Sequence, residues 1–565
     1  MGWQKDLIDV IRKEKFSIGS SIKQPLAIEL HRALAHLSTE IYQNSMHFVK
    51  ELIQNAEDNK YEKQVRPSLE FLLTNQDVAG VGVPATLLVL NNERGLLSAD
   101  VDSLCSVKKS TKAGKRDKGY IGCKGIGFKS VFMVSITPII ISNGFRISFQ
   151  DDPDEEAGVA YLVPKWVDTP TDNAILAACG RDTMPNTVII LPLRHDKVEL
   201  VRKQLKGLSP ENILFLSKIR ELHVVDRTED RANRRGVLRI IRSDPISNVT
   251  GEISPRIVSG VEVKGSYKFF KVTLSVERNG EGFSDTFPYL VFQGLFPVTD
   301  PDVERQEVNE WAISVAFPLE GRASSHDAGD IFCFLPTELR TGFPFIVNAD
   351  FILTSSRECI RFNADWNSGI LNCVPVAFEV AFSRMILPPR SNSKFLSDRR
   401  DAYKFLPVKA VGNSYRYSPA GSMEDRNVRQ KLEVQPQQAS NIPELEKVRV
   451  EIFERVGKHK YIFLSSPGNF DIGLQLSMDY NLPAKACLFI HSSFRKILES
   501  AARWDHPAPL AVLEGRSKFG IIDEYVQERY ASGLAALGVS NMTVAQYESF
   551  LLNLPDRIFL GWVQK

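Results

Sequence analysis

The chain has 565 residues, of which 43% are hydrophobic and 24% charged, an ordinary balance for a globular protein. A single core stops growing at about 250–300 residues, so we expect two or three domains in line. Seventy basic against 68 acidic residues leave a net charge of +2, which does not indicate nucleic-acid binding but leaves a local basic patch open. The seven cysteines include no CxxC pair, so we expect neither a structural zinc site nor a secreted disulfide framework.

The chain shows no membrane or targeting signal by pattern. Residues 1–15 are charged and helical, unlike the apolar core of a signal peptide. We find no apolar run of the ~20 residues that a membrane span needs, and therefore predict no membrane partner. With the cysteine usage, this predicts a location in the cytoplasm or nucleus, and the lysine-rich segment at 105–120 favours the nucleus.

The predicted elements of the first 220 residues indicate an α+β domain. Hydrophobic residues recur at helical spacing through 1–60, and an apolar run at 84–91 indicates a buried strand. A lysine- and glycine-rich loop follows at 105–120, and a glycine turn opens into a helix at 122–135. Further strands are expected at 136–141, 145–149 and 187–193.

Three further regions follow residue 220. Short alternating strands predict a β-rich α+β domain at 221–387. Residues 388–445 are rich in Pro, Ser, Asn and Gln, a composition typical of a linker. Residues 446–565 are predicted to be helical, and their apolar faces either pack in a core or dock a protein partner or a second copy of the chain.

The helix expected at 48–58 carries the first candidate site. Glu51, Asn55 and Asp58 are spaced i, i+4, i+7 and share one face. An apolar stripe lies beside them, formed by Phe48, Leu52 and Ala56. The asparagine offers a hard oxygen to Mg²⁺, and the glutamate can orient or deprotonate a water molecule. A solvated polar face on an amphipathic helix is the alternative interpretation.

Three other segments combine polar groups with glycines or strand ends. Asn91 ends a predicted strand before a turn at Gly95, so its amide could read the edge of a base. Residues 121–132, IGCKGIGFKSVF, place three glycines before a helix whose unpaired N–H groups attract anions, without matching a P-loop or a GxGxxG motif. Thr187 opens another strand. Ordinary turns and strand exits use the same residues, so no segment is specific alone.

In this order, the four segments resemble the GHKL ATPase superfamily, which includes gyrase B, heat-shock chaperones, histidine kinases and MutL. ELIQNAED at 51–58 looks like its N-box, IGCKGIGFKSVF is similar to the chaperone-type glycine box, and residues 105–120 fall where the ATP lid lies. The closer resemblance is to the sacsin and plant No Vein-like branch. It implies a Bergerat-type ATP-binding sandwich of helices on a mixed sheet, a transducer-like α+β domain after it, and ATP and Mg²⁺ as cofactors.

The resemblance also implies a role for each site residue. Glu51 would be the water-activating base, Asn55 would hold Mg²⁺, and Asp58 would lie beside the nucleotide. The adenine would be surrounded by Asn91, Gly95, Leu96 and Thr187. The lid and the phosphate loop would contribute Lys109, Ser110, Gly122, Lys124, Gly125, Gly127 and Phe128.

A downstream segment at 343–358, FPFIVNADFILTSSRE, predicts a strand, a tight turn and a basic residue before a helix. An arginine there can simply be a surface residue. In the chaperone branch, the second domain supplies an arginine from a similar turn to the γ-phosphate. The resemblance therefore assigns this role to Arg357, whose planar guanidinium suits a triphosphate oxygen.

Two hypotheses of function stay open. The usual D-x-G-x-G reads here as Asn91-Asn-Glu93-Arg-Gly95, which makes the adenine acceptor neutral and adds a bulky charge at Glu93. The first hypothesis is a Mg²⁺-dependent, slow ATPase that acts as a nucleotide-driven switch or chaperone-like module. The second is a pseudo-ATPase scaffold with little or no turnover. We do not expect a histidine kinase, because no sensor segment accompanies His31 or His36.

Overall fold

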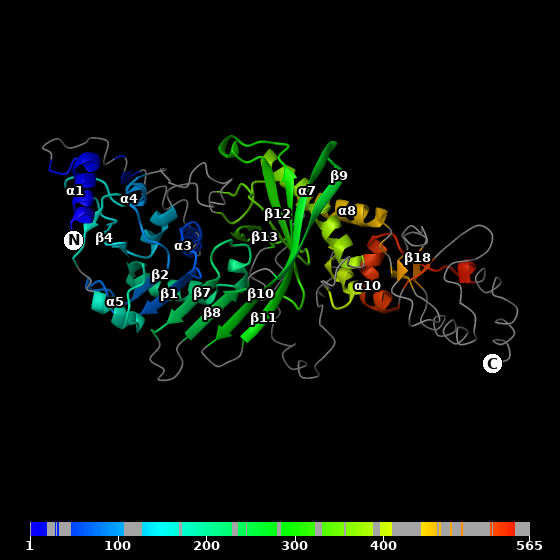
Figure 1. The fold of residues 1–565 in the computed structure, drawn as a ribbon, viewed down its shortest axis with the longest axis horizontal. Helices are drawn as coiled ribbons and strands as arrows, with labels where there is room; N and C mark the ends of the chain where they lie inside the picture. The colour runs from blue at the N-terminus through cyan, green and yellow to red at the C-terminus, as the bar shows by residue number, and fades with distance from the viewer. Residues whose placement is uncertain are drawn as a thin grey trace.

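The computed structural model describes residues 2–19, 29, 31–32, 47–106, 127–168, 172–228, 236–243, 246–278, 284–322, 330–354, 357–387, 396–408, 442–459, 461, 463–464, 475–476, 487–489, 520–522 and 524–547. The described elements extend along one long axis, from α1 at one end to β18 near the other (Figure 1). Helices and a large mixed sheet make this an α+β protein, as the sequence predicts.

One mixed sheet of 15 strands organises the molecule, in the order β14-β13-β15-β12-β11-β10-β8-β7-β1-β2-β6-β3-β4-β5, with β9 on β10. Its first part contains β1 (Ser68–Thr74), β2 (Thr86–Asn91), β3 (Ile139–Ser142), β4 (Phe145–Ser148), β5 (Lys165–Trp166), β6 (Thr187–Pro192), β7 (Glu221–Asp226) and β8 (Gly236–Arg242). Its second part contains β9 (Ile246–Val258), β10 (Val261–Arg278), β11 (Ser284–Pro297), β12 (Glu310–Pro318), β13 (Ile331–Cys333), β14 (Leu335–Pro336) and β15 (Ile346–Asn348).

Both faces of the first part of the sheet are covered. Along β1, Leu69, Phe71 and Leu73 point into one core while Leu72 points into the other, because successive side chains of a strand alternate between faces. The helices of this half are α1 (Trp3–Phe16), α3 (His47–Glu57), α4 (Ser98–Leu104), η2 (Gly127–Met133), α5 (Asp172–Cys179), η3 (His195–Lys197), α6 (Val198–Lys206) and η4 (Pro210–Ile213). α1, α3, η2 and α6 pack on one face and α5 on the other.

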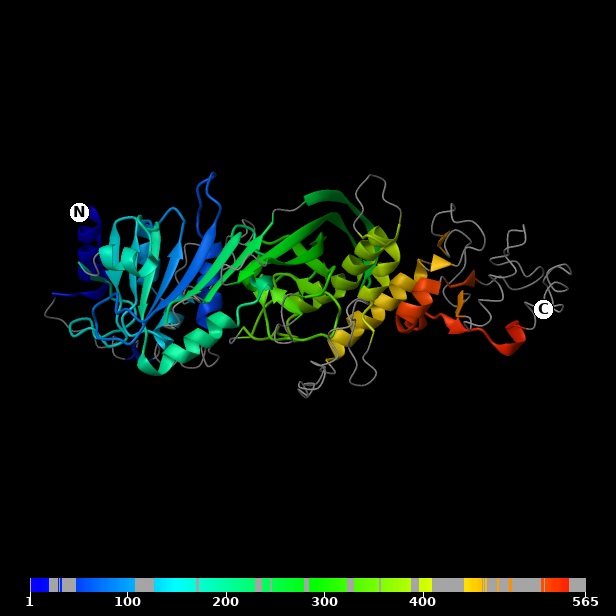
Figure 2. The same cartoon turned by 90° about the horizontal axis from the view of Figure 1, so that it is seen from below.

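The long strands β10 and β11 connect the two parts of the sheet. Val272 and Leu274 of β10 lie in the N-terminal core, whereas Tyr267 and Phe269 of the same strand lie in the C-terminal core. Figure 2 shows the sheet passing without a break from the blue and cyan strands into these long green ones. β7, which opens the predicted second domain, pairs in parallel with β1 of the first. The two halves therefore share backbone hydrogen bonds, and the predicted boundary at residue 220 lies inside one sheet.

Helix α7 (Asp365–Ile386) is the main helix of the C-terminal core and packs against β11 and β12. Its length and its mean hydropathy of 1.4 meet the requirements of a membrane span. Such a segment was not predicted from the sequence. However, 78% of its most apolar stretch is buried inside the protein, as expected of a core helix.

The C-terminal part combines helices with short strands. Its described elements are η5 (Val303–Arg305), η6 (Arg399–Phe405), α8 (Pro443–Lys458), β16 (Phe463–Leu464), β17 (Gln475–Leu476), β18 (Cys487–Phe489), β19 (Gly520–Ile521), α10 (Glu524–Ala536) and β20 (Ser540–Asn541). The strands form a two-stranded and a three-stranded sheet, so the prediction of a helical region at 446–565 is not confirmed. Within the predicted linker, Tyr403 and Phe405 of η6 are buried in the C-terminal core, because aromatic side chains seek burial whatever the surrounding composition.

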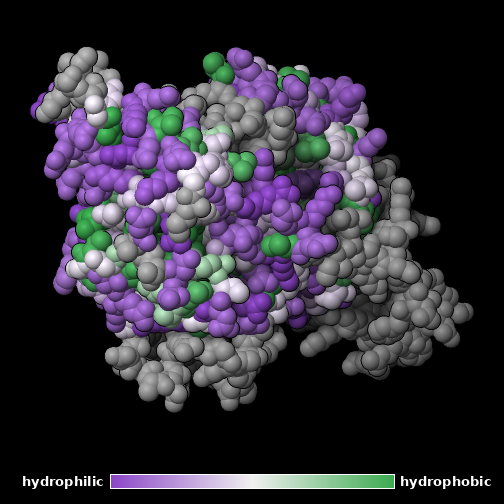
Figure 3. Space-filling model, turned by 60° about the vertical axis from the view of Figure 1, so that its left-hand side comes forward, coloured by the Kyte–Doolittle hydropathy of each residue, from purple (hydrophilic) through white to green (hydrophobic). Residues whose placement is uncertain are grey.

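The surface of the molecule is predominantly hydrophilic on the face drawn in Figure 3, where hydrophobic residues are scattered singly among polar ones. Isolated exposed hydrophobic residues are normal on protein surfaces. This face therefore offers no broad apolar patch among the described residues.

Candidate functional site

The predicted N-box helix forms as α3 and lies against the sheet. Its apolar stripe, Phe48, Leu52 and Ala56, is buried in the N-terminal core, as predicted. Glu51 and Asp58 are also buried, with 4% and 1% of their surface exposed, whereas Asn55 is half-buried. A solvated polar face would leave such carboxylates in water. The solvated interpretation therefore does not describe these two residues, since burying a charge is costly unless it has partners.

Glu51 has its partner in the distant segment that the sequence also singled out. Nη1 of Arg357 lies 2.7 Å from Oε1 of Glu51, and the same nitrogen donates a hydrogen bond to Oε1 of Gln54. Gln54 is one turn along α3 from Glu51 and is 6% exposed. The side chain of Arg357 thus contacts the predicted N-box helix, although 303 residues separate it from Gln54 in the sequence.

The turn that carries Arg357 is tightly closed. The backbone N–H of Arg357 donates to the carbonyl of Thr354, and the N–H of Thr354 donates to the carbonyl of Cys359. Arg357 adopts φ of 57°, in the left-handed region that non-glycine residues rarely occupy. Such a conformation costs on the order of 1–3 kcal/mol and persists only where the surroundings impose it. This backbone strain marks the turn as a functional candidate.

Gly127 of the glycine box lies directly against Glu51. A Cβ at this position would fall on Oε2 of the Glu51 carboxylate, closer than non-bonded atoms can approach. A larger residue here would therefore have to displace the Glu51 carboxylate, which gives one glycine of the predicted phosphate loop a physical reason. The next residue, Phe128, packs its ring against Phe149 in the core, at 6.0 Å between ring centroids. Only its backbone is thus placed to contribute to a site.

Lys129, which follows, is a buried cation that the sequence did not single out. Its Nζ donates to the carbonyls of Leu104 and Tyr161, at 2.5 and 2.7 Å, and lies 4.9 Å from the ring centroid of Phe149. Burial lowers the pKa of Lys129 to about 8. The residue joins the end of α4 to η2, the two elements that flank residues 107–126.

The predicted adenine acceptor, Asn91, is occupied by hydrogen bonds within the protein. Its Oδ1 accepts from the backbone N–H of Glu93 at 2.9 Å, and its Nδ2 donates to the hydroxyl of Tyr61 at 3.0 Å. Burial raises the pKa of Tyr61 well above its usual value. Asn91 therefore holds the turn after β2 in shape, and its amide reaches a ligand only by sharing these bonds.

Glu93 forms the centre of a second buried network. Oγ1 of Thr187 donates to Oε1 of Glu93 at 2.9 Å, and the Thr187 and Ser142 hydroxyls are 2.6 Å apart. The backbone N–H of Leu96 in turn donates to Oγ of Ser142. Gly95, at φ of 93°, makes the turn between them and leaves no room for a Cβ beside Asn143. The structure thus brings Asn91, Gly95, Leu96 and Thr187 together in the region of Glu93, and their assignment to an adenine pocket stays a prediction.

Sequence reasoning missed several participants in these networks. Gln54 shares the face of Glu51 at i+3, a spacing that could have indicated it. Ser142 meets Thr187 only because β3 pairs with β6 in that register, which one sequence does not disclose. Glu57, which is 1% exposed, accepts backbone hydrogen bonds from Ser217 and the two residues after it, and so anchors a loop.

Part of the predicted phosphate site lies outside the described residues. This applies to the lid and to most of the glycine box, namely Lys109, Ser110, Gly122, Lys124 and Gly125. The described site therefore consists of α3, the turn after β2, the start of β6, Gly127 and the Arg357 turn.

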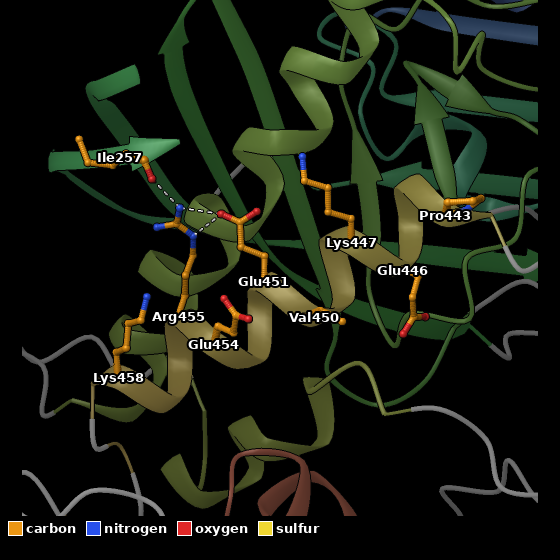
Figure 4. Close-up of a pocket in the computed structure, with 9 residues that line it drawn as sticks. All are labelled: Ile257, Pro443, Glu446, Lys447, Val450, Glu451, Glu454, Arg455 and Lys458. Atoms are coloured by element: carbon orange, nitrogen blue, oxygen red, sulfur yellow. Dashed lines mark hydrogen bonds and ion pairs between the residues drawn. The ribbon is translucent and has the colours of Figure 1, made fainter. Parts of the chain in front are cut away.

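A separate hollow of about 650 Å³ lies along α8, in the C-terminal half of the molecule (Figure 4). Arg455 of α8 donates there to Glu451 and to the carbonyl of Ile257 on β9. Its lining carries three acidic and three basic side chains, so it offers no net charge to a phosphate. The lining residues are Ile257, Pro443, Glu446, Lys447, Val450, Glu451, Glu454, Arg455 and Lys458.

Known proteins resemble much of the chain. Residues 29–160 match the family model of the Sacsin domain. The chain is 33% identical to Protein NO VEIN of Arabidopsis thaliana over 397 residues, and 20% identical to Sacsin of Homo sapiens over 409 residues. These alignments cover 66% and 59% of this chain but only 13% and 8% of the two relatives. The matches support the sacsin and No Vein-like branch that the sequence motifs indicate.

The Sacsin-domain match includes Glu51, Asn55, Asn91, Glu93 and Gly127. Thr187 and Arg357 lie beyond it. The sacsin-like segment therefore does not contain the whole candidate site, because the later strands and the Arg357 turn complete it.

Proposed function

We propose that the chain is a Mg²⁺-dependent ATP-binding protein of the GHKL superfamily, with a Bergerat-type fold in its N-terminal half. It would hydrolyse ATP slowly and act as a nucleotide-driven switch or chaperone-like module. The observation that carries this proposal is the meeting of Glu51, Gly127 and Arg357, which come from an acidic helix, a glycine box and a distant turn. A buried carboxylate with a guanidinium beside a bare backbone suits the terminal phosphate of a nucleotide.

The oxygen donors at this site fit Mg²⁺. Asn55 is half-buried one turn after Glu51 and can present an amide oxygen, which a hard cation prefers. The described residues contain no group of three or more His, Cys, Asp or Glu side chains that could hold a metal by themselves. Mg²⁺ commonly takes one or two protein oxygens and completes its shell with phosphates and water, so Asn55 would hold it together with the nucleotide.

Each residue has a distinct part in the proposed reaction. Mg²⁺ would neutralise charge on the phosphates when bound. Glu51 would orient the attacking water and accept its proton, and Arg357 would bind an oxygen of the terminal phosphate. The β-rich second half would act as a transducer, since Arg357 belongs to it while Glu51 belongs to the first half.

Three proteins test this function. Wild type should release phosphate from ATP at a slow, Mg²⁺-dependent rate. Asn55→Ala should lose Mg²⁺-dependent ATP binding in calorimetry, whereas Glu51→Gln should still bind ATP but lose turnover by 10²-fold or more, on the order of a general-base contribution. Equal turnover in wild type and Glu51→Gln would assign the phosphate release to another site or to a contaminant.

A pseudo-ATPase scaffold is the second candidate, and the position of Glu93 favours it. Its buried carboxylate is hydrogen-bonded to Thr187, the residue predicted to complete the adenine pocket. If Glu93 fills that pocket, wild type should bind ATP poorly and Glu93→Gly should bind it more tightly. If Glu93 instead helps to recognise the base, Glu93→Gly should weaken binding. Calorimetry with Mg²⁺ and ATP on both proteins separates the two.

A further inference from the structure

We infer that Gln54 is the positioning residue for Arg357: its amide seats the guanidinium at the site, and the terminal phosphate of a bound nucleotide replaces Glu51 as the ionic partner of Arg357. This inference rests on the proposed function. It assigns a role to a residue of the N-box segment for which the sequence motifs imply none.

The first observation is how Arg357 distributes its donors. Nη1 donates a hydrogen bond to Oε1 of Gln54 and forms an ion pair with Oε1 of Glu51 at 2.7 Å. Within the described part of the chain, the Nε and Nη2 groups of Arg357 have no hydrogen-bond or ion-pair partner. The guanidinium is thus held at one nitrogen and keeps the donors of its other edge, which is the edge that a phosphate needs for two parallel hydrogen bonds.

The second observation is that the acceptor side is rigid. Gln54 and Glu51 lie three residues apart on α3 and are both buried, so their side chains cannot follow Arg357 if it moves away. Neighbouring Lys50 donates to the carbonyl of Pro336 at 2.9 Å, which ties the same helix to β14. Among the described residues, α3 therefore contacts the second half of the molecule through Lys50 as well as through the Arg357 contact at the candidate site.

The third observation concerns charge. While Arg357 is paired with Glu51, its positive charge stabilises the ionised carboxylate and makes Glu51 a weaker proton acceptor. A terminal phosphate carries more negative charge than a carboxylate and offers several oxygens to Arg357. Transfer of the ionic contact from Glu51 to the phosphate would release Glu51. The neutral amide of Gln54 would keep the guanidinium in place during the exchange, because it does not compete with the phosphate for charge.

The first arm of the test requires no nucleotide. Thermal unfolding is measured for Gln54→Ala, Arg357→Ala and the double variant. If Gln54 acts through Arg357, the double variant should melt no lower than the worse single variant, because each removes the same contact. Gln54→Glu, which keeps an acceptor at the same place, should retain the coupling. Gln204→Ala is the matched control, because the side-chain amide of this buried glutamine on α6 has no hydrogen-bond partner among the described residues, so its loss should be additive with Arg357→Ala.

The second arm compares ATP with ADP in calorimetry with Mg²⁺. Gln54→Ala should weaken ATP binding by about tenfold, the value of one hydrogen bond to a charged group, and leave ADP binding unchanged. Arg357→Lys should show the same selective loss, since an ammonium cannot donate from a planar fork. A glutamine that merely supports the fold would weaken both nucleotides equally.

The outcomes separate this inference from the proposed function. If wild type binds ATP but the unfolding effects of Gln54→Ala and Arg357→Ala are additive, only the role of Gln54 is overturned. The same holds if Gln54→Ala weakens ATP and ADP binding equally. Coupled unfolding in a chain that binds no nucleotide would reduce the contact to a structural one, and would overturn both the inference and the proposed function.

Discussion

The carboxylate of Glu51 is paired with Arg357 through Oε1 and lies close to the backbone of Gly127 with Oε2. A side chain held in this way loses little conformational entropy when it acts, which is the general advantage of a preorganised site. Its neighbours Asn91 and Glu93 are equally constrained, but by bonds within the protein. Glu51 is thus paired with a group from a distant segment, whereas Asn91 and Glu93 are hydrogen-bonded to residues near them in the fold.

Gly127→Ala tests the contact between the glycine box and Glu51. The added methyl group would overlap the Glu51 carboxylate, so either the carboxylate moves off Arg357 or η2 shifts. Overpacking of this kind costs about 1–3 kcal/mol. Urea unfolding should show this loss, whereas Gly207→Ala, where a Cβ meets neighbours only at 3.4 Å, should change stability little. Equal effects of the two substitutions would contradict the assigned contact.

Because Lys129 is buried, we expect the free energy of unfolding to rise as the pH becomes alkaline. Burial lowers the pKa of Lys129 from 10.5 to about 8, so the folded state releases this proton before the unfolded state does. Below pH 8 the cost of burying the charge is fully present, and it is relieved as the pH rises from 8 to 10.5. The full difference is about 3 kcal/mol. Urea unfolding between pH 7.5 and 10 should show wild type gaining stability relative to Lys129→Met, and parallel pH profiles would contradict it.

The individual elements show what the sequence could predict and where it could not. α3, β2 and β6 were predictable because their hydrophobic residues follow the period of a helix or form an unbroken apolar run. The meeting of Ser142 with Thr187 was not, since it depends on the β3–β6 register. The same applies to Arg357 and Gln54, because a contact across 303 residues leaves no local pattern. The resemblance of the motifs indicated Arg357 as a site residue, but it did not indicate the contact of Arg357 with Gln54.

At the C-terminal end of α8, a buried charge cluster holds α7, α8 and β9 together. Oε1 of Glu379 on α7 lies 2.6 Å from Nε2 of His459 and 3.1 Å from Nε of Arg256. Its Oε2 lies 3.5 Å from Nη1 of Arg455. Burial acts to raise the pKa of Glu379, but the hydrogen bond from His459 and the charge of Arg256 outweigh it, and the pKa is lowered. The stability from this carboxylate is therefore present above pH 4.5 and is lost as the pH falls through the lowered pKa.

Glu379→Gln should destabilise the protein at pH 7 by about 1–3 kcal/mol, because it removes the buried carboxylate that pairs with Arg256 and Arg455 while Arg455 keeps Glu451 as a partner. Thermal unfolding measures the loss, and hydrogen exchange should show that α8 opens first. Below pH 4, the difference in stability between Glu379→Gln and wild type should become smaller. Glu446→Gln, on the exposed side of α8, is the control and should have little effect. A constant difference from pH 3 to pH 7 would rule out the ionised carboxylate as the cause.

For the whole molecule, the continuous sheet is the dominant feature. β10 and β11 contribute side chains to both cores, so neither core is complete without strands that also serve the other. The arrangement allows a change at the Arg357 turn to reach α3 through packed elements rather than through a hinge. This could not be predicted from composition, which shows only that the chain is long enough for two or three cores.

Phe71→Ala and Phe292→Ala test whether the two cores unfold together. Both side chains are fully buried, Phe71 in the N-terminal core and Phe292 in the C-terminal core. Each truncation should cost about 3–5 kcal/mol. Because the sheet is shared, each variant should shift the same cooperative transition in urea, followed by circular dichroism and tryptophan fluorescence. Two separate transitions, each sensitive to one variant, would indicate independent halves.

The central claim is that the site around Glu51, Asn55 and Arg357 binds Mg²⁺ and ATP. Titration of ATP into the wild-type chain by calorimetry, with and without Mg²⁺, tests it most directly. We predict saturable binding with a Kd below 1 mM that requires Mg²⁺, a free energy of at least about 4 kcal/mol. No binding at several millimolar ATP with Mg²⁺ present would contradict the account, and would assign the buried Glu93 network the role of closing the site.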